Sequence, residues 1–156
     1  MGIAYNTSIV AEGLVFALDA ANPRSYSGSG ITVNCLVGIG GTLINGVGFT
    51  STNSGSFVFD GTNDYFAIKD KYYEGNGSTT QLTVSAWVKT THNNNNWTSN
   101  WSIVDFDRSE HFNFFVHGKG KASFSTRGSG INDFHGGNDG QLNDGEWHQM
   151  TGVFDG

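Results

Sequence analysis

The chain has 156 residues, about the length of one domain, and its formal net charge is −6 with only 14% charged residues. It holds 23 glycines, one proline and 13% aromatic residues, a composition that argues against disorder and favours a folded β protein punctuated by glycine. No block of lysine or arginine could follow a phosphate backbone, and no apolar run reaches the ~20 residues of a membrane span, so we expect neither nucleic acid binding nor membrane insertion.

Short strands separated by glycine-rich turns are predicted in the N-terminal half. Leu14 to Leu18 is apolar at every position, which predicts a first strand in the middle of a sheet. Weak, glycine-broken strands follow on either side of a turn predicted at Asn45-Gly46. Two more strands are predicted at Ser56 to Phe59 and Tyr65 to Ile68, and the Asp60-Gly61-Thr62-Asn63 segment between them predicts a tight hairpin.

The clearest strand pattern runs from Gln81 to Lys89, where apolar side chains occupy every second position. Because successive side chains of a strand point to opposite faces, one face carries the apolar residues and the other carries Thr83, Ser85, Trp87 and Lys89. The polar segment Thr91 to Asn100 follows. It predicts a surface loop, since it contains four consecutive asparagines.

The remaining chain predicts a meander and a final strand. The predicted strands are Trp101–Asp107, Phe112–His117, Ala122–Arg127 and Trp147–Phe154. Gly118-Lys119-Gly120 predicts a turn within the meander, and Ser129 to Gly145 predicts a long loop. Roughly nine short strands with even turn spacing predict an all-β fold, an antiparallel β-sandwich or jelly roll, as one domain over residues 1–156.

Four phrases, in this order, resemble the laminin-G-like branch of the concanavalin A-like superfamily. They are GLVFALDAAN from Gly13, GSFVFDGTNDY from Gly55, LTVSAWV from Leu82 and GEWH from Gly145. The resemblance spans nearly the whole chain and implies a concanavalin A-like jelly roll. The opening SIVAEGLVFALDAANPRSYSGSG, from Ser8, is similar to the start of laminin-G-like structural proteins of tailed bacteriophages, where such domains sit on tail fibres, capsid knobs or other virion surfaces.

This resemblance implies a place on the surface of a virion. The partners it implies are other virion proteins, further copies of the same chain in a homo-oligomer, and a cell-surface glycan. Related domains usually continue after the Trp-His strand with a hairpin and a closing strand, so we expect the C-terminal closing strands to be missing after Gly156. The first basic residue is Arg24, so we also expect no signal peptide, which a virion origin would explain.

Asp105, Asp107 and Glu110 look like the Glu-x-Asp-x-x-Glu signature of laminarinase-type glycoside hydrolases, which share the superfamily fold. Retaining hydrolysis needs two carboxyl groups about 5–5.5 Å apart. Asp105 and Asp107 share a face of a regular strand, whereas Glu110 has the opposite parity and would join them only through a bulge. The first position is also aspartate instead of glutamate. We therefore expect no catalysis, and a hydrolase of this type is the alternative function.

Asp60, Asn63 and Asp64 offer the hard oxygen ligands that Ca²⁺ prefers. The same residue types also build turns, because their side chains hydrogen-bond to the nearby backbone. Calcium is the one cofactor that the sequence suggests. His148 follows Trp147 in the family-like phrase and is predicted to be a structural hydrogen-bonding residue.

Aromatic and amide side chains predict a sugar-binding surface. Flat aromatic rings can stack on the apolar faces of pyranoses while amides bond their hydroxyl groups. The candidates are Trp87, Trp97, Asn95, Asn96 and Tyr73, although packing in the core is the more common role for strand residues such as Trp87 and Trp101. We therefore predict a non-catalytic virion-surface module, adhesive or architectural, with host glycans as its candidate ligands.

Overall fold

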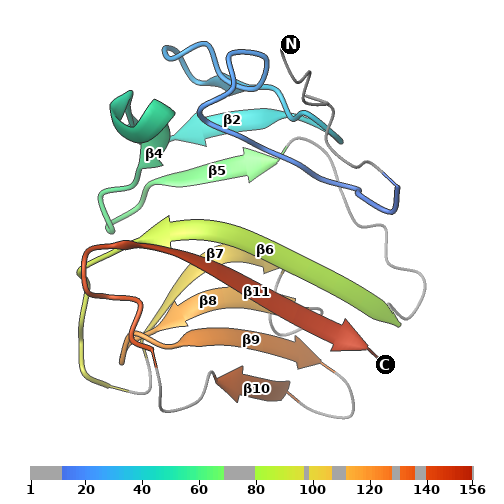
Figure 1. Ribbon diagram of the computed structural model, residues 1–156, viewed down its shortest axis with the longest axis vertical. Coiled ribbons are helices and arrows are strands. Elements are labelled where there is room, and N and C mark those ends of the chain that lie inside the picture. Colours follow the sequence, from blue (N-terminus) through green and yellow to red (C-terminus); the bar gives the residue numbers. More distant parts are fainter. Residues whose placement is uncertain are drawn as a thin grey trace, which may run out of the picture. The chain divides into compact units, whose positions relative to one another are not determined.

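The computed structural model describes residues 12–68, 80–96, 99–106, 112–127, 131–135 and 140–155. These segments are all-β apart from one short 3₁₀ turn, η1 (Thr52–Ser54) (Figure 1). They belong to two compact units, the first within Met1–Gly75 and the second within Asn76–Gly156. No helix in these segments has the length and apolar character needed to cross a membrane.

The first unit contains two small antiparallel sheets. One has the order β1-β2-β5, with β1 (Thr32–Val33), β2 (Gly41–Ile44) and β5 (Tyr65–Ile68). The other pairs β3 (Gly48–Thr50) with β4 (Ser56–Val58). The core of the first unit consists of Tyr26, Val33 and Leu43. The partly buried residues packed against this core are Leu18, Val47, Phe49, Phe57 and Phe66.

The turn predicted at Asn45-Gly46 is confirmed. Asn45 has φ 64° and Gly46 has φ 104°, the left-handed region that asparagine and glycine tolerate best. This turn carries the chain from β2 to β3.

The predicted hairpin between residues 56 and 68 is wrong. β4 pairs with β3, and β5 pairs with β2, so the two strands lie in different sheets. The Asp60 Oδ1 atom accepts backbone hydrogen bonds from Thr62 at 2.8 Å and Asn63 at 3.3 Å. The aspartate therefore builds a local turn that redirects the chain and does not close a ladder between β4 and β5.

The strand predicted at Leu14 to Leu18 is also wrong. The structure has a single β-bridge there, between Ala17 and Val37, and Val15 is 66% exposed. A strand in the middle of a sheet needs ladder partners on both sides. An apolar sequence alone does not supply them, because strand preference depends on neighbouring strands.

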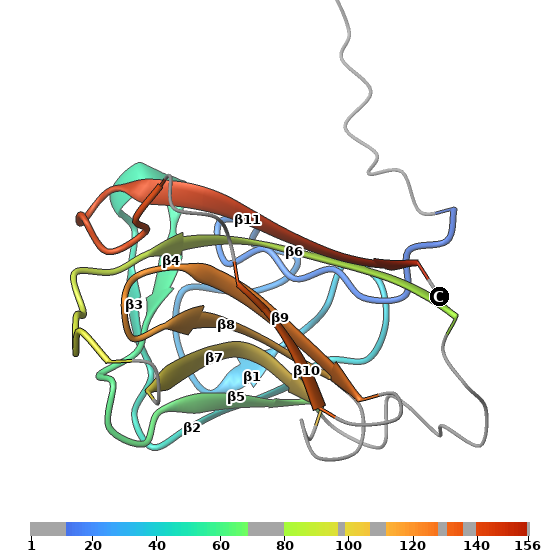
Figure 2. The ribbon, with the colours of Figure 1, turned by 90° about the horizontal axis from the view of Figure 1, so that it is seen from below.

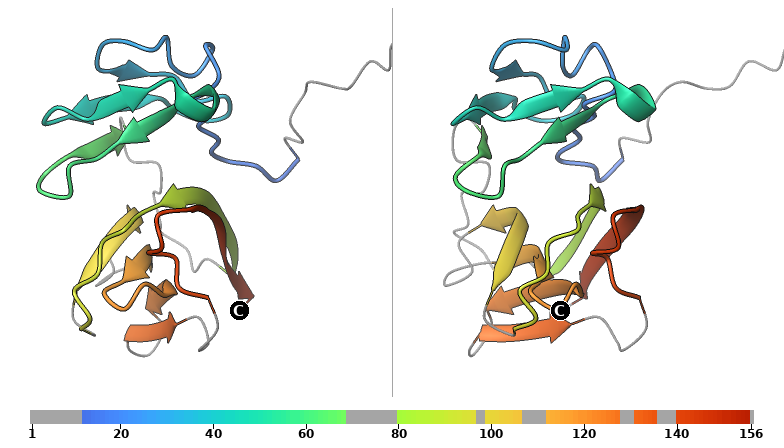
Figure 3. Two further views of the ribbon diagram at one scale, coloured as in Figure 1. Left: turned by 60° about the vertical axis from the view of Figure 1, so that its left-hand side comes forward. Right: turned by 90° about the vertical axis from the view of Figure 1, so that its left-hand side faces the viewer.

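The second unit contains two antiparallel sheets that pack face to face. The larger has the order β10-β9-β8-β7, with β7 (Asn100–Phe106), β8 (Phe112–His117), β9 (Ala122–Arg127) and β10 (Ile131–His135). The smaller pairs β6 (Gln81–Lys89) with β11 (Trp147–Asp155) along their whole length. Figure 2 shows β6 and β11 running side by side, and Figure 3 shows this pair facing the four-stranded sheet.

The predicted bounds of β5, β6, β8 and β9 are confirmed, and so is the turn before β9. That turn closes with a hydrogen bond from the Gly120 N–H to the His117 carbonyl at 2.7 Å. The loop predicted from Ser129 to Gly145 is wrong in part, because it contains β10. The sequence of β10, INDFH, has little strand character of its own, and the strand forms through its ladder with β9.

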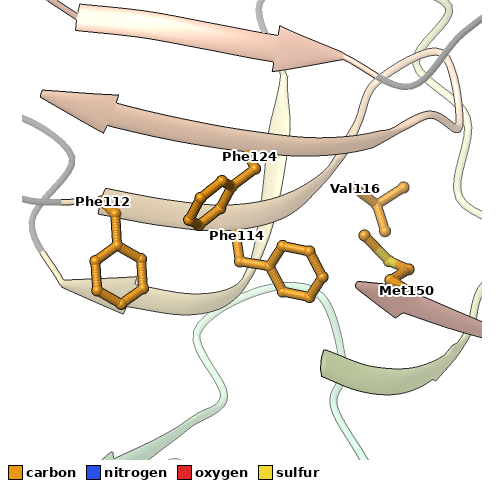
Figure 4. Packing of buried hydrophobic residues seen from close by; sticks show 5 residues of the cluster. All are labelled: Phe112, Phe114, Val116, Phe124 and Met150. Atoms are coloured by element: carbon orange, nitrogen blue, oxygen red, sulfur yellow. The ribbon is translucent and has the colours of Figure 1, made fainter. Parts of the chain in front are cut away.

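Apolar side chains from both sheets form the core of the second unit. Phe112, Phe114, Val116, Phe124 and Met150 are buried there (Figure 4). The inward face of β6 packs against them with Leu82, Val84, Ala86 and Val88. Gly152 lies in the middle of β11, where a Cβ atom would stand 3.0 Å from a ring carbon of Phe124 and 3.3 Å from one of Phe114. The rings therefore occupy the space that a side chain at position 152 would need.

Candidate functional site

The outward side of the β6–β11 sheet carries two exposed tryptophans. Burial alternates along both strands, so that every second residue points away from the core. Trp87 is 65% exposed and Trp147 is 36% exposed. The prediction that Trp87 shares an outer face with Ser85 and Lys89 is confirmed, and its alternative placement in the core is wrong.

The two tryptophans are diagonal neighbours on this face. Trp87 lies opposite Gln149, and Trp147 lies opposite Lys89. Diagonal residues of an antiparallel pair lie about 7–8 Å apart, within reach of large aromatic side chains. We call the outward residues of this end of the sheet the tryptophan face, which consists of Ser85, Trp87, Lys89, Trp147, Gln149 and Thr151.

Polar side chains order the surface beside the tryptophans. The hydroxyl groups of Ser85 and Thr151 share a hydrogen bond of 3.1 Å across the two strands. The Ser85 hydroxyl also lies 3.1 Å from the Met150 carbonyl and donates to it, and the Gln149 amide donates to Ser85 at 3.4 Å. These hydroxyl and amide groups form a connected row next to the indole rings.

Sequence reasoning missed Trp147 as a binding residue. The alternation of β11 was available in the sequence, since Trp147 and Met150 have opposite parity and Met150 suits the core. What the sequence did not provide was the register. Only the pairing of Lys89 with Trp147 places the second indole beside the first.

Three loops meet at the end of the second unit where β6 ends and β11 begins. They comprise residues 90–96, 118–120 and 140–146, and we call them the loop end. Backbone hydrogen bonds join them, from Asn95 to the Gly118 carbonyl at 3.1 Å and from Leu142 to the Gly120 carbonyl at 2.8 Å. Because β6 runs directly into the first loop and β11 starts directly after the third, the tryptophan face adjoins the loop end.

The predicted ligand residues of the asparagine-rich loop have different roles. The Asn96 Oδ1 atom accepts a hydrogen bond from the Ser99 N–H at 2.9 Å, so this side chain shapes the loop. Asn95 is exposed with φ 49°, and its N–H donates to Asn93 Oδ1 at 2.8 Å. Trp97 and Tyr73, the other two predicted ligand residues, lie outside the described residues.

One polar pair joins the third loop to β11. The His148 Nε2 atom lies 2.9 Å from Asp144 Oδ1, which also accepts the Glu146 N–H at 2.9 Å. The hydrogen bond from His148, followed by that from the Glu146 backbone, lowers the pKa of Asp144 below its usual value. His148 thus has the structural hydrogen-bonding geometry that the sequence predicts.

The predicted calcium ligands Asp60, Asn63 and Asp64 belong to the turn between β4 and β5. The Asp60 N–H donates to Asp64 Oδ2 at 3.1 Å, and hydrogen bonds led by that of the Thr62 backbone lower the pKa of Asp60. The Asp64 Oδ1 atom is buried, and no atom of the described residues forms a hydrogen bond with it. The described segments contain no group of three or more histidine, cysteine, aspartate or glutamate residues arranged to hold a metal, so calcium binding here stays a prediction.

Of the carboxylates of the hydrolase signature, only Asp105 is described. It lies exposed on β7, opposite Asn113 of β8, beyond a bulge between Ser102 and Val104. Asp107 and Glu110 lie outside the described residues. The hydrolase alternative therefore stays a prediction.

The family model described as "Concanavalin A-like lectin/glucanases superfamily" matches residues 60–156, which is more than half of the chain and contains both sheets of the second unit. No curated protein and no solved structure matches the chain. The all-β structure with its antiparallel sheets agrees with the β-sandwich of this family. The chain therefore belongs to the concanavalin A-like lectin/glucanase superfamily.

Proposed function

We propose that this chain is a non-catalytic adhesion module that binds carbohydrate on its tryptophan face. The observation that carries the proposal is the exposure of Trp87 and Trp147 as diagonal neighbours among the polar side chains of the tryptophan face. At 65% exposure, Trp87 forgoes about 3 kcal/mol of apolar burial, which a bound ligand could recover.

The chemistry of the face favours a sugar over other ligands. The indole rings offer flat surfaces for the apolar faces of pyranoses, and the row of Ser85, Thr151 and Gln149 offers donors and acceptors for hydroxyl groups. A protein partner would favour a more continuous apolar centre. Nucleic acid would require several cations, and Lys89 is the only one on the outward face of β6 and β11.

We further propose that the module works on the surface of a bacteriophage particle. The support is the resemblance of the opening residues 8–30 to laminin-G-like phage structural proteins. Its partners there would be other virion chains and further copies of itself. Mass spectrometry of purified particles from the phage that encodes this chain should detect it in stoichiometric amounts, and its absence from the particles would contradict this setting.

A glycan array tests the binding function. We expect the wild-type chain to give a signal that is lost in Trp87→Ala and retained in Tyr65→Ala, since Tyr65 is a 51% exposed aromatic residue of the first unit. Both variants should unfold as the wild type does, because they alter exposed side chains. A wild-type chain that binds no glycan but incorporates into particles would favour an architectural role.

Incubation with β-glucan tests the catalytic alternative. We expect no release of reducing sugar by the wild-type chain. Hydrolysis that disappears in Glu110→Gln would overturn the non-catalytic assignment.

A further inference from the structure

Lys89 is a neighbour of both exposed tryptophans on the outward face. It lies directly opposite Trp147 and two residues from Trp87, on the same face of β6. The Cβ atoms of directly opposite residues lie about 5 Å apart, and those of residues i and i+2 on one strand lie about 7 Å apart. A ligand ring on either indole would therefore lie beside the ammonium group. Lys89 is exposed, and it forms no ion pair within the segments that the structure describes.

No other outward side chain of β6 or β11 carries a charge close to Lys89. The one acidic residue among the outward side chains of β6 and β11 is Asp155, which is bonded to Gln81 Nε2 at the far end of the sheet. Gln81 and Lys89 are eight residues apart along one strand, a distance of about 26 Å. That exceeds the screening length of about 8 Å at physiological ionic strength, so Asp155 does not neutralise Lys89.

We propose that the tryptophan face selects an acidic glycan, with the carboxylate of a uronic acid paired with Lys89 while its pyranose ring stacks on Trp87 or Trp147. This inference rests on the proposed function and specifies its ligand. An unpaired ammonium group beside two aromatic rings complements a sugar that carries one negative charge per ring. The net charge of −6 on the chain disfavours polyanions of higher charge density such as nucleic acid.

Binding to a matched pair of polymers tests the inference. Isothermal titration calorimetry would compare polygalacturonate with its methyl ester, which has the same backbone without the charge. The variant Lys89→Gln is matched with Arg24→Gln, which removes one positive charge from an exposed site in the first unit.

We expect the wild-type chain to bind polygalacturonate about two- to five-fold more tightly than the ester, the range of a single exposed ion pair. Lys89→Gln should lose this preference without losing affinity for the ester, and Arg24→Gln should keep it. Added salt should weaken the binding of polygalacturonate to the wild type more than the binding of the ester.

Three results would overturn the inference. One is equal wild-type affinity for both polymers that Lys89→Gln does not change, which would leave the proposed carbohydrate binding intact. The second is binding to neither polymer, in which case the glycan array decides the proposed function separately. The third is loss of the preference in Arg24→Gln as well, which would attribute the preference to overall charge and contradict the role of Lys89.

Discussion

The two sides of β11 carry residues of opposite size and exposure. On the inward side, Gly152 leaves room for the rings of Phe114 and Phe124, and the small residue is required by close packing. On the outward side, the large ring of Trp147 meets solvent and a row of hydroxyl and amide groups. A single strand therefore supplies both the tight packing of the core and the exposed surface that we assign to binding.

The inward side makes a prediction for Gly152→Val. The added side chain has no space beside Phe124, so we expect the free energy of unfolding to fall by about 1–3 kcal/mol, as in other overpacked cores. Denaturant unfolding measures this loss. The control is Val153→Thr on the outward side, where the residue is 65% exposed and the effect should stay within about 0.5 kcal/mol. Equal stability of the two variants would contradict the packing at Gly152.

A second prediction concerns Asp144 and pH. Because hydrogen bonds from His148 and the Glu146 backbone lower the folded-state pKa of Asp144, its carboxylate stabilises the fold above the unfolded-state pKa, and that stabilisation is lost as pH falls through the folded-state value. In His148→Ala, the pKa of Asp144 should rise toward its usual value, as followed by NMR titration of the carboxyl carbon. An unchanged pKa in this variant would show that the backbone bond alone is responsible.

At the scale of elements, local pattern predicts the strands better than their partners. Gln81 to Lys89 alternates so regularly that its bounds and its two faces follow from the sequence, and Trp87 falls on the correct side. The hairpin expected around Asp60 fails because the side chain of that residue bonds to the turn, and the pairing partners of β4 and β5 lie elsewhere in the chain. The sequence does not predict strand β10, because the strand forms through its pairing with β9 and its own composition gives little strand signal.

The turn between β4 and β5 carries the calcium prediction. If Asp60, Asn63 and Asp64 hold Ca²⁺, the ion should raise the melting temperature of the chain, since a ligand that binds only the folded state stabilises it by mass action. Asp64→Asn should abolish that rise, and Asp144→Asn, a matched change in the second unit, should preserve it. A melting temperature indifferent to calcium in the wild type would leave these residues as a turn only.

The edges of the smaller sheet make a prediction about assembly. In the part of the chain that the structure describes, β6 and β11 pair only with each other, so each presents a long edge of unpaired backbone groups. Such edges invite pairing with another strand. We therefore expect sedimentation equilibrium to give a mass larger than that of one chain, and a monomer at all concentrations would contradict the predicted homo-oligomer.

At the scale of the molecule, the composition and the family match both indicate an antiparallel β fold. A chain poor in charge and rich in glycine and aromatic residues folds into antiparallel sheets, and the family match covers both sheets of the second unit. The tryptophan face and the loop end then lie together because β6 and β11 exchange hydrogen bonds over their whole length. That arrangement depends on contacts between residues more than fifty positions apart, so the sequence could suggest Trp87 and the asparagines but not their combination with Trp147 and Lys89.

The most direct test of carbohydrate binding on the tryptophan face is an NMR titration that follows the indole N–H signals, assigned by single Trp→Phe substitutions, as polygalacturonate is added. We predict that the signals of Trp87 and Trp147 shift together. The signal of Trp101, whose ring centroid lies 4.3 Å from that of His92, should stay in place. Shifts confined to Trp101, with Trp87 and Trp147 unchanged under conditions where the glycan binds, would contradict the account.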